Sequence, residues 1–405
     1  MQRQASLLFI FTTIAIDSIG LGIIIPVLPD VIRRFVSDPD QVSRVYGYFV
    51  AVYAILQFLS SPLLGSLSDR FGRRPVLLVS LLGAAIDYFF MAYAPTLPLL
   101  FLGRIVSGVS GASFTVASAY IADISNDENR SKNFGVMGAG FGLGFILGPA
   151  IGGPLAALGP QYPFLAAGAF NFANLLFGAL VLPESLPRER RRRVEFGALN
   201  PLRSFRNTFA IPGITGLLIV HILLQLAGQT HPSIWTLYTQ HRYGWSAAEV
   251  GFSLAAVGVM SAISQGALTG VIVKRFGEAR TLVFGSLGET LGFLCFGLAT
   301  AGWMLYATLI VSSIFWAVQP ALQSLISREA PPETQGELQG TLMGLGSLCG
   351  IINPLVMTQL FSLTSNPERE PYIPGSPYLL GSAMLALAFV IALRWYAGIA
   401  EPARS

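Results

Sequence analysis

Charged residues are scarce in this sequence. Asp, Glu, Lys and Arg make up only 11% of its 405 residues, whereas a soluble domain has about 25%. Hydrophobic residues make up 53%, and the mean hydropathy is +0.62. This composition excludes a soluble globular protein. The net charge of +4 does not indicate nucleic-acid binding, because the basic residues lie in short segments between apolar runs, where they set the orientation of membrane helices.

Cysteine and histidine are also rare, with two and three copies. Cys295 and Cys349 both lie inside apolar runs, so we expect small core residues rather than a disulfide framework. The sequence has no cluster with metal-ligand spacing and no nucleophile–base arrangement. We therefore expect neither an enzyme nor a bound metal or cofactor. A cleavable signal peptide is not expected, because the first apolar run, residues 5–28, is too long and has no small-residue cleavage site behind it.

Twelve long apolar runs fill most of the chain. A membrane helix needs about 20 apolar residues, and the segments between these runs are short. The sequence therefore predicts an all-α polytopic membrane protein with twelve transmembrane helices. The predicted spans are residues 5–28, 45–66, 76–95, 97–121, 133–157, 162–182, 209–238, 248–272, 281–300, 302–326, 338–363 and 376–397.

The longest connection before the midpoint, residues 183–208, contains a run of arginines that cannot enter a bilayer. We place there a basic cytoplasmic linker between two pseudo-symmetric six-helix bundles, residues 1–182 and 209–405. Landmarks in the two halves repeat with one offset, as expected for parallel halves of a transporter. The pairs that lie 205 positions apart are Gly65 and Gly270, Arg70 and Arg275, Gly135 and Gly340, and Pro149 and Pro354.

The distribution of basic residues predicts the orientation. If both termini are cytoplasmic, nineteen of the 25 Lys and Arg residues fall in inner segments, five in outer segments, and Arg104 inside a span. Because cytoplasmic loops carry the excess of Lys and Arg, we expect both termini on that side.

Four ionisable residues lie inside predicted spans: Asp17, Asp87, Arg104 and Glu289. Each costs several kcal/mol if it faces lipid, so each should face the bundle interior or a water-filled cavity. Asp17 and Glu289 have no evident partner of opposite charge at their depth, which favours a functional acid that binds and releases protons. Asp87 and Arg104 lie on consecutive spans, so a structural ion pair and a functional role are equally good interpretations.

The seventh predicted span contains Gln229, Thr230 and His231 directly before Pro232. A proline breaks a helix and frees backbone carbonyls at the depth where transporters bind substrates. These three side chains are therefore candidates for polar contact with a solute. His231 can also titrate, although a hydrogen-bonded structural histidine is at least as good an interpretation.

The loop from Gly65 to Pro75 joins the second and third predicted spans. Its pattern G-x-x-x-D-R-x-G-R-R contains Gly65, Asp69, Arg70, Gly72, Arg73 and Arg74. The glycines permit a tight turn, and Asp69 can pair with a neighbouring helix end. We expect Asp123 and Arg130 to join this loop in an ion-pair network that closes the cytoplasmic side. The pattern resembles the loop between the second and third helices of major facilitator transporters.

The fifth predicted span reads G-x-x-x-G-P-x-x-G-G through Gly144, Gly148, Pro149, Gly152 and Gly153. Small residues four apart permit close helix packing, and physics alone favours that interpretation. The order of residues, however, resembles the fifth-helix motif of exporters that exchange a solute for protons. The resemblance implies efflux rather than uptake.

A more specific resemblance is to the bacterial tetracycline/proton antiporters. It rests on residues 17–29, 67–78 and 103–108 and continues through Trp235, residues 242–245 and residues 320–323. The resemblance implies a major facilitator fold that exports tetracycline, chelated to a divalent cation such as Mg2+, in exchange for protons. It implies functional roles for six residues of this sequence, which are Asp17, Asp69, Arg70, Asp87, Arg104 and Glu289.

Two positions depart from that family's pattern. The ninth-helix acid is Glu289 rather than an aspartate, and the eighth-helix position often occupied by histidine is Ser261. Both lie in the half expected to shape the substrate side of the cavity. We predict proton-coupling roles for Asp17, Asp87 and Glu289. The predicted substrate contacts are Asp17, Gln57, Arg104, Gln229, Thr230, His231, Ser261 and Glu289.

We therefore predict a proton-coupled exporter in the bacterial inner membrane. Its expected partners are a small-molecule solute, protons and membrane lipids, without nucleic acid, and a single copy should suffice for transport. The alternative is a major facilitator transporter of a sugar or another small polar metabolite. A non-transporting receptor is disfavoured by the retained acids inside the spans.

Overall fold

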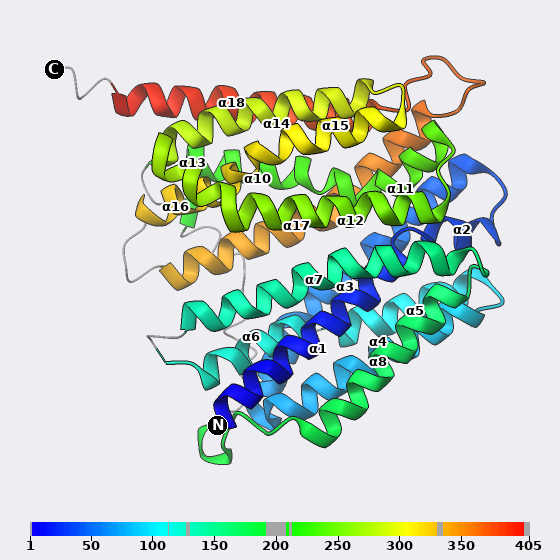
Figure 1. Ribbon diagram of the computed structural model, residues 1–405, viewed down its shortest axis with the longest axis vertical. Helices are drawn as coiled ribbons and strands as arrows, with labels where there is room; N and C mark the ends of the chain where they lie inside the picture. The colour runs from blue at the N-terminus through cyan, green and yellow to red at the C-terminus, as the bar shows by residue number, and fades with distance from the viewer. Residues whose placement is uncertain are drawn as a thin grey trace. The chain divides into compact units, whose positions relative to one another are not determined.

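The computed structural model describes residues 2–111, 113–126, 130–191, 208–209, 213–329 and 335–400. Helices make up nearly all of this part of the chain (Figure 1). Twelve segments within it are long and apolar enough to cross a membrane, which confirms the predicted fold class. Most of the predicted linker, residues 192–207, lies outside the described residues.

Within the described residues, the first six spans consist of seven helices. One short helix, α2 (Leu28–Arg33), lies between the first and second spans, and η1 (Arg188–Arg190) follows the sixth. The spans themselves are α1 (Gln2–Ile24), α3 (Pro39–Phe71), α4 (Arg73–Tyr93), α5 (Leu97–Ser110) with α6 (Ser113–Ile124), α7 (Arg130–Ala156) and α8 (Tyr162–Val181).

The last six spans contain more interruptions. They are α10 (Thr215–Gly228) with α11 (Thr230–Tyr243), α12 (Ala247–Ile263) with η3 (Ser264–Leu268) and α13 (Thr269–Phe276), α14 (Glu278–Leu298), α15 (Gly302–Ser312) with η4 (Ser313–Ala317) and α16 (Val318–Glu329), α17 (Gln335–Thr364), and α18 (Ser376–Ala400).

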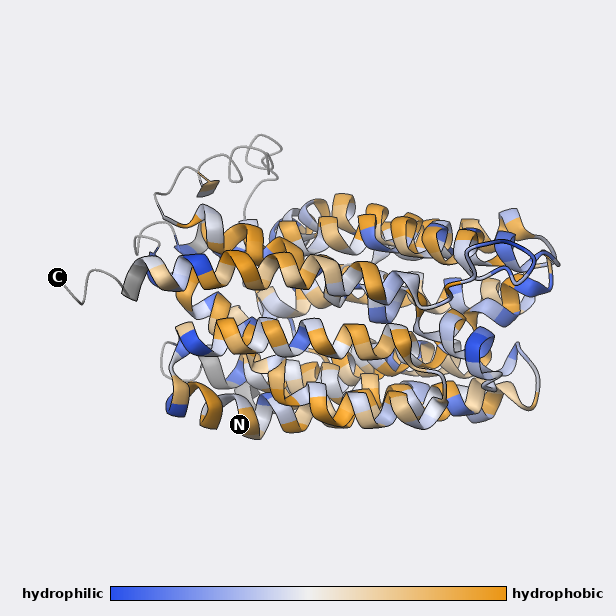
Figure 2. Cartoon of the chain, turned by 90° about the horizontal axis from the view of Figure 1, so that it is seen from above, coloured by the Kyte–Doolittle hydropathy of each residue, from blue (hydrophilic) through white to orange (hydrophobic). Residues whose placement is uncertain are grey.

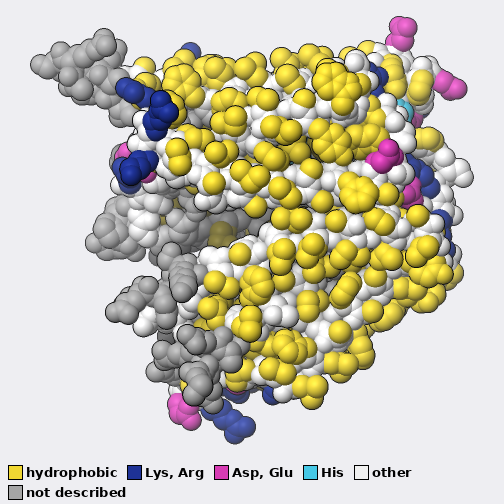
Figure 3. All heavy atoms as spheres, in the orientation of Figure 1, with side chains coloured by type: hydrophobic (Ala, Val, Ile, Leu, Met, Phe, Trp, Pro, Cys, Tyr) yellow, Lys and Arg dark blue, Asp and Glu magenta, His cyan; other side chains and the backbone are white. Residues whose placement is uncertain are grey.

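Large apolar side chains are exposed along the helices (Figure 3), which consist mostly of hydrophobic residues (Figure 2). Leu59 is 64% exposed, Leu180 is 85% exposed and Val271 is 64% exposed. A helix on the surface of a soluble protein turns such residues toward the core. Charged side chains gather instead toward the helix ends in Figure 3. This distribution is the one that a lipid bilayer requires.

The chain forms two compact units. Unit 1 comprises Met1–Asp38, Tyr48–Leu199 and Trp245–Gly258, and unit 2 comprises Pro39–Gly47, Asn200–Gly244 and Val259–Ser405. The first turns of α3 therefore group with unit 2, and the first half of α12 groups with unit 1. The division into halves at 1–182 and 209–405 stays a prediction about the sequence repeat.

Helix interruptions fall at matching positions of the fourth and tenth spans. The fourth is interrupted at Gly111, where the backbone leaves the helical region (φ −73°, ψ 55°). The residue 205 positions later, Trp316, lies in the 3-10 segment η4. The eighth span contains the π-helical turn η3, a feature frequent at functional sites. None of these three interruptions was predicted, because none is marked by a proline.

The seventh span is interrupted as predicted, but before the proline rather than at it. α10 ends at Gly228 and α11 begins at Thr230. Pro232 therefore lies in the first turn of α11, where the backbone N–H groups have no helical acceptor and the missing donor costs little. A proline cannot donate to the carbonyl four residues earlier, which here is that of Gly228.

Candidate functional site

Asp87 of α4 and Arg104 of α5 form an ion pair inside unit 1. Asp87 is fully buried and Arg104 is 7% exposed. The guanidinium NH2 and Nε groups both approach the carboxylate, with Nε 3.3 Å from Oδ1. A Cβ added to Gly103 would lie 2.7 Å from the same Oδ1, so the glycine permits this close approach. The sequence left open whether these two residues pair, and the structure pairs them.

Aromatic rings of α3 enclose the arginine of this pair. The guanidinium carbon of Arg104 lies 5.4 Å from the ring centroid of Phe49 and 5.3 Å from that of Tyr53. Such cation–π contacts stabilise a cation that has lost its water. Arg104 therefore has both an anionic partner and two ring faces, which fix the direction of its side chain.

Asp17 of α1 accepts a hydrogen bond from Ser113 Oγ at 2.6 Å. Ser113 is the first residue of α6, so the interruption of the fourth span places this donor. The Nε2 group of Gln57 donates to the Gly111 carbonyl at the same interruption, and also to the Tyr53 hydroxyl, both at 3.0 Å. Asp17 is thus held by a neutral hydroxyl, whereas Asp87 is held by a cation.

We call Asp17, Gln57, Asp87 and Arg104 the charged cluster. The structure brings these four predicted residues together within unit 1 on α1, α3, α4 and α5. Sequence reasoning missed Tyr53 and Ser113, which connect them. The spacing Phe49, Tyr53 and Gln57, with one residue every four, is a signal that could have found Tyr53, because such residues share a helix face.

Glu289 of α14 is the buried acid of unit 2. It is 9% exposed, and its Oε1 has no hydrogen-bond partner among the described residues. The neighbouring Gly292 permits close packing, since its added Cβ would lie 3.0 Å from Ser312 Cβ on α15. An acid in such a place needs either a proton or a partner that arrives from outside the fold.

The three polar residues of the seventh span have different surroundings. Thr230 is fully buried and accepts from Asn353 Nδ2 at 3.2 Å. Gln229 is partly exposed at the interruption. His231 packs against four aromatic rings with centroids 4.8 to 5.7 Å away, which are Trp235, Phe293, Phe296 and Tyr378.

This packing agrees with the structural interpretation of His231, and its contact with a solute stays a prediction. Ser261 lies near the end of α12, before the π-helical turn. It accepts a hydrogen bond from Gln265 Nε2 at 2.9 Å. Gln265 is itself exposed and belongs to that turn.

The glycines of α7 use two faces. Gly148 faces α1, where its added Cβ would lie 2.7 Å from Gly22 Cα. Gly144 and Gly152 face the same helix, against the backbone near Ala15 and Ile23. Gly153 instead contacts the start of α12 at Ala247, and Pro149 lies between the two helices, with its ring near Gly22 and its carbonyl near Gly251. The close packing expected from the motif is present, and its connection with efflux stays a prediction.

A second group of polar residues lies where α3 meets α4. Gly72 alone joins the two helices, with φ 107°, a conformation that favours glycine. Arg73 pairs with Asp69 at 2.6 Å and donates from Nε to Asp123 at 3.0 Å. It also donates to Ser68 Oγ at 2.7 Å. The predicted network of the loop with Asp123 is therefore present.

Other predicted members of this network lie elsewhere. Arg70 is exposed and lies over the ring of Phe71. The guanidinium of Arg74 donates to the Ala179 carbonyl at 2.5 Å. Gly65 has ordinary van der Waals contact, with its added Cβ 3.9 Å from Thr115. The side chain of Arg130 lies outside the described part of the structure.

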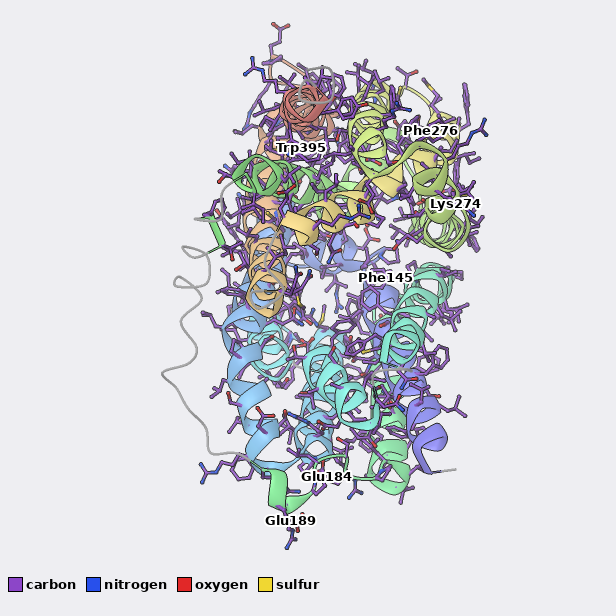
Figure 4. All side chains as sticks on the ribbon, turned by 90° about the vertical axis from the view of Figure 1, so that its left-hand side faces the viewer. Phe145, Glu184, Glu189, Lys274, Phe276 and Trp395 are labelled. Carbon is purple, nitrogen blue, oxygen red and sulfur yellow. The ribbon has the colours of Figure 1, made fainter. Side chains whose placement is uncertain are left out.

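Glu184, which sequence reasoning missed, completes the network. Its carboxylate accepts from the backbone N–H groups of Arg73 at 2.8 Å and Arg74 at 3.3 Å. In Figure 4 it lies among the helix ends, whereas Glu189 points away from them. An acid at a helix N-terminus is favourable, and α4 needs one because it begins with two arginines. No local motif in the sequence marks this partner, which is more than a hundred residues away.

Comparison with known proteins agrees with this architecture. The sequence profile of the Major Facilitator Superfamily matches residues 10–354 and 217–404. The class C tetracycline resistance protein of Escherichia coli is 41% identical over 95% of this chain and 95% of its own length. The class G protein of Vibrio anguillarum is 38% identical over 97% of this chain and 98% of its own length.

A similar fold is found in a solved structure. The crystal structure of the human organic anion transporter MFSD10 (TETRAN) has a TM-score of 0.70 at 24% identity, and covers 97% of this chain and 100% of its own. Twelve apolar spans, buried charges within them and full-length similarity all lead to one assignment. The chain belongs to the Major Facilitator Superfamily of membrane transporters, in the family of the tetracycline resistance proteins.

Proposed function

We propose that this protein exports tetracycline, carried as a chelate with Mg2+, in exchange for protons. The observation that carries the proposal is the similarity along the full length to tetracycline resistance proteins of several classes. The acids Asp17, which is partly buried, and Glu289, which is buried, support proton exchange, because neither forms an ion pair with a cation among the described residues. A sugar as solute has no comparable observation in its favour.

The residues divide into four roles in this proposal. Asp17 and Glu289 bind protons or the solute, and the Asp87–Arg104 pair orients the charged cluster. Gln57, Gln229, Thr230, His231 and Ser261 supply further polar contacts to the solute. The loop residues around Arg73 and Asp123 form a latch whose opening and closing accompanies alternating access.

The membrane and its sidedness follow from the same proposal. In this proposal both termini lie in the cytoplasm, an orientation supported by the excess of Lys and Arg in the segments that it assigns to that side. The membrane is the inner membrane of a bacterium, where an outward flux of drug is useful. No resident cofactor is required, since the proton gradient supplies the energy and Mg2+ enters as part of the cargo. One copy of the chain carries the complete charged cluster.

Uptake of labelled tetracycline into inverted vesicles tests the proposal. Vesicles that contain this protein should accumulate the drug when their interior is acidified, and the accumulation should need Mg2+. Vesicles without the protein, and vesicles treated with a protonophore, are the controls. Folded protein that gives no gradient-driven uptake would refute tetracycline as the solute.

The two unpaired acids can be separated in the same vesicles. If Glu289 carries the exchanged proton, Glu289→Gln should remove the pH dependence of drug binding while leaving binding itself measurable. Unchanged pH dependence in this variant would assign the proton to Asp17. Ser118→Ala, which removes a surface hydroxyl of α6, is the matched control for effects of mutation as such.

A further inference from the structure

Glutamine side chains connect α16 and α17 near the ends of these helices that the proposed orientation places in the cytoplasm. Gln319, Gln323 and Ser327 follow one another at intervals of four residues on α16, so they share one face of that helix. Gln323 Nε2 donates to Gln339 Oε1 of α17 at 3.0 Å. Gln339 Nε2 in turn donates to Ser327 Oγ at 3.1 Å. Side-chain hydrogen bonds therefore join the two helices here.

A third helix continues this series toward the middle of the membrane. Gln319 Nε2 donates to Gln225 Oε1 of α10 at 3.3 Å. Gln229 follows Gln225 by four residues and lies fourteen residues from each end of the seventh span, Thr215–Tyr243. We call five of these residues the glutamine row, which consists of Gln225, Gln229, Gln319, Gln323 and Gln339. The row thus extends from one end of unit 2 to the middle of a span.

Glycines of α17 leave space for the inner part of the glutamine row. A Cβ added to Gly346 would lie 2.8 Å from Gln225 Nε2, and one added to Gly350 would lie 3.7 Å from Gln229 Nε2. An alanine in place of Gly346 would therefore press against the amide of Gln225. Both glutamines remain partly exposed beside these glycines, so their amides are accessible from outside the helix packing.

The glutamine row is uncharged, polar and not fully used by the fold. Gln323 is exposed, and the other four members are partly exposed. Among the described residues, neither the NH2 group of Gln225 nor the carbonyl oxygen of Gln319 has a hydrogen-bond partner. A polar group without a partner is costly in hydrocarbon, so the row must face water rather than lipid. Its amides can both donate and accept hydrogen bonds.

We propose that the glutamine row is the path along which the solute moves between the cytoplasm and the middle of unit 2. The spare amide groups bind the solute by hydrogen bonds and contribute no charge. They therefore fit an oxygen-rich edge of hydroxyl, keto and amide groups, such as tetracycline has, and leave the charge of the chelate to other residues. The inference rests on the proposed function and adds four residues, together with a direction of travel, to the predicted contact at Gln229.

Thiol labelling in inverted vesicles tests whether the row faces water. The parent for this experiment carries Cys295→Ser and Cys349→Ala, and single cysteines then replace Gln225 and Gln323. A membrane-impermeant, negatively charged methanethiosulfonate is added outside, at the face that corresponds to the cytoplasm. Both cysteines should be modified, and the one at position 323 should react faster because it lies nearer the cytoplasmic end.

Phe284→Cys is the matched control for depth. Phe284 is 59% exposed and lies six residues from the start of α14, just as Gln323 lies six residues from the end of α16. Its cysteine should react at least about tenfold more slowly, because neither the charged reagent nor a thiolate is stable in hydrocarbon. If the cysteines at 225 and 323 react no faster than this control, the row faces lipid or is sealed, and the proposal is overturned.

Transport kinetics test whether the solute uses the row. Gln225→Leu should raise the KM for tetracycline by about three- to tenfold, the factor expected for one lost hydrogen bond between neutral groups. Its kcat should stay within about twofold of the parent value, since the contact is made before the proton step. Gln359→Leu is the same change at a partly exposed glutamine near the other end of α17, and it should leave KM unchanged. Equal KM values for the parent and Gln225→Leu would overturn the proposal.

Protection by the drug keeps this inference distinguishable from the proposed function. Tetracycline with Mg2+ should slow the modification of Gln225→Cys several-fold. If the protein transports tetracycline but the drug gives no protection, the solute takes another path and the inference is wrong. If the protein transports no tetracycline and both cysteines of the row are still modified from the cytoplasmic face, tetracycline is the wrong solute and the water-facing path stands.

Discussion

The loops after the second and eighth spans turn at glycines of similar conformation, but the residue that follows the glycine is basic in one loop and acidic in the other. Gly72 and Gly277 lie 205 positions apart and have φ 107° and 77° with ψ 156° and 159°. In unit 1, Arg73 of α4 pairs with Asp123 of α6 at 3.0 Å. The residues at the equivalent positions of unit 2 are Glu278 and Arg328, and they pair at 2.9 Å. The repeat has kept the ion pair and reversed its direction.

The reversal has a consequence for the helix that follows each glycine. α14 begins with Glu278, an acid at the positive end of the helix dipole. α4 begins with two arginines at that end, where cations are unfavourable. Glu184 offsets this by accepting from the first N–H groups of α4. We call these two turns, at Gly72 before α4 and at Gly277 before α14, the two corners. The corner of unit 1 thus needs a carboxylate from a distant part of the chain, whereas in unit 2 the first residue of the helix, Glu278, is itself the acid.

The interiors of the two units also differ in the charged residues at equivalent positions. The positions equivalent to Asp87 and Arg104 are Gly292 and Leu309. Unit 2 therefore has no counterpart of the buried ion pair at these positions, and its buried acid Glu289 has Oε1 without a partner in the described chain. Unit 1 therefore contains a buried ion pair beside Asp17, whereas the buried acid of unit 2 has no cation partner among the described residues.

Loss of the buried pair should have the largest effect. Asp87→Asn leaves the cation of Arg104 without its anion inside unit 1, and removal of one partner from a buried pair costs about 3–5 kcal/mol. We expect a lower thermal midpoint and little folded protein in the membrane. The double variant Asp87→Asn, Arg104→Gln should recover part of the loss, because no unpaired charge remains. If Asp87→Asn is as stable as the parent, the ion pair is solvated. The interiors of the two units would then not differ in the way described above.

The comparison of the two interiors shows what the sequence can predict. Twelve spans were predictable, because length and hydropathy decide them. The burial of Asp87, Arg104 and Glu289 was predictable for the same reason. Other contacts were not predictable, since they come from distant parts of the chain: Tyr53 contacts Arg104, Ser113 donates to Asp17, and Glu184 accepts from the start of α4. Helix interruptions were found from sequence only beside Pro232, because the others depend on packing between helices.

The two corner ion pairs should differ in strength. The side chain of Asp123 is 19% exposed and that of its partner Arg73 is 10% exposed, whereas the side chain of Arg328 is 70% exposed. Asp123→Asn should therefore destabilise the protein by about 1.5–3 kcal/mol, the range for a hydrogen bond to a charged group. Arg328→Gln should cost about 0–1 kcal/mol, as for a surface pair. Thermal midpoints of the two variants in the same detergent measure the difference, and equal losses would mean that burial does not distinguish the corners.

The glycines of the two corners provide the smallest and most closely matched comparison. Alanine is strained at both, because each has a positive φ, at a cost of about 1–2 kcal/mol. Gly72 has a second obstacle, since an added Cβ would collide with the Glu184 carboxylate and come within 2.9 Å of Arg191, whereas no atom of the described residues lies within 4 Å of one on Gly277. Gly72→Ala should therefore lower the thermal midpoint further than Gly277→Ala. The excess should disappear when Glu184→Ala is added, because the methyl group then has space. If the excess loss of stability remains, it comes from backbone strain alone. The Glu184 carboxylate would then no longer explain why the start of α4 tolerates its two arginines.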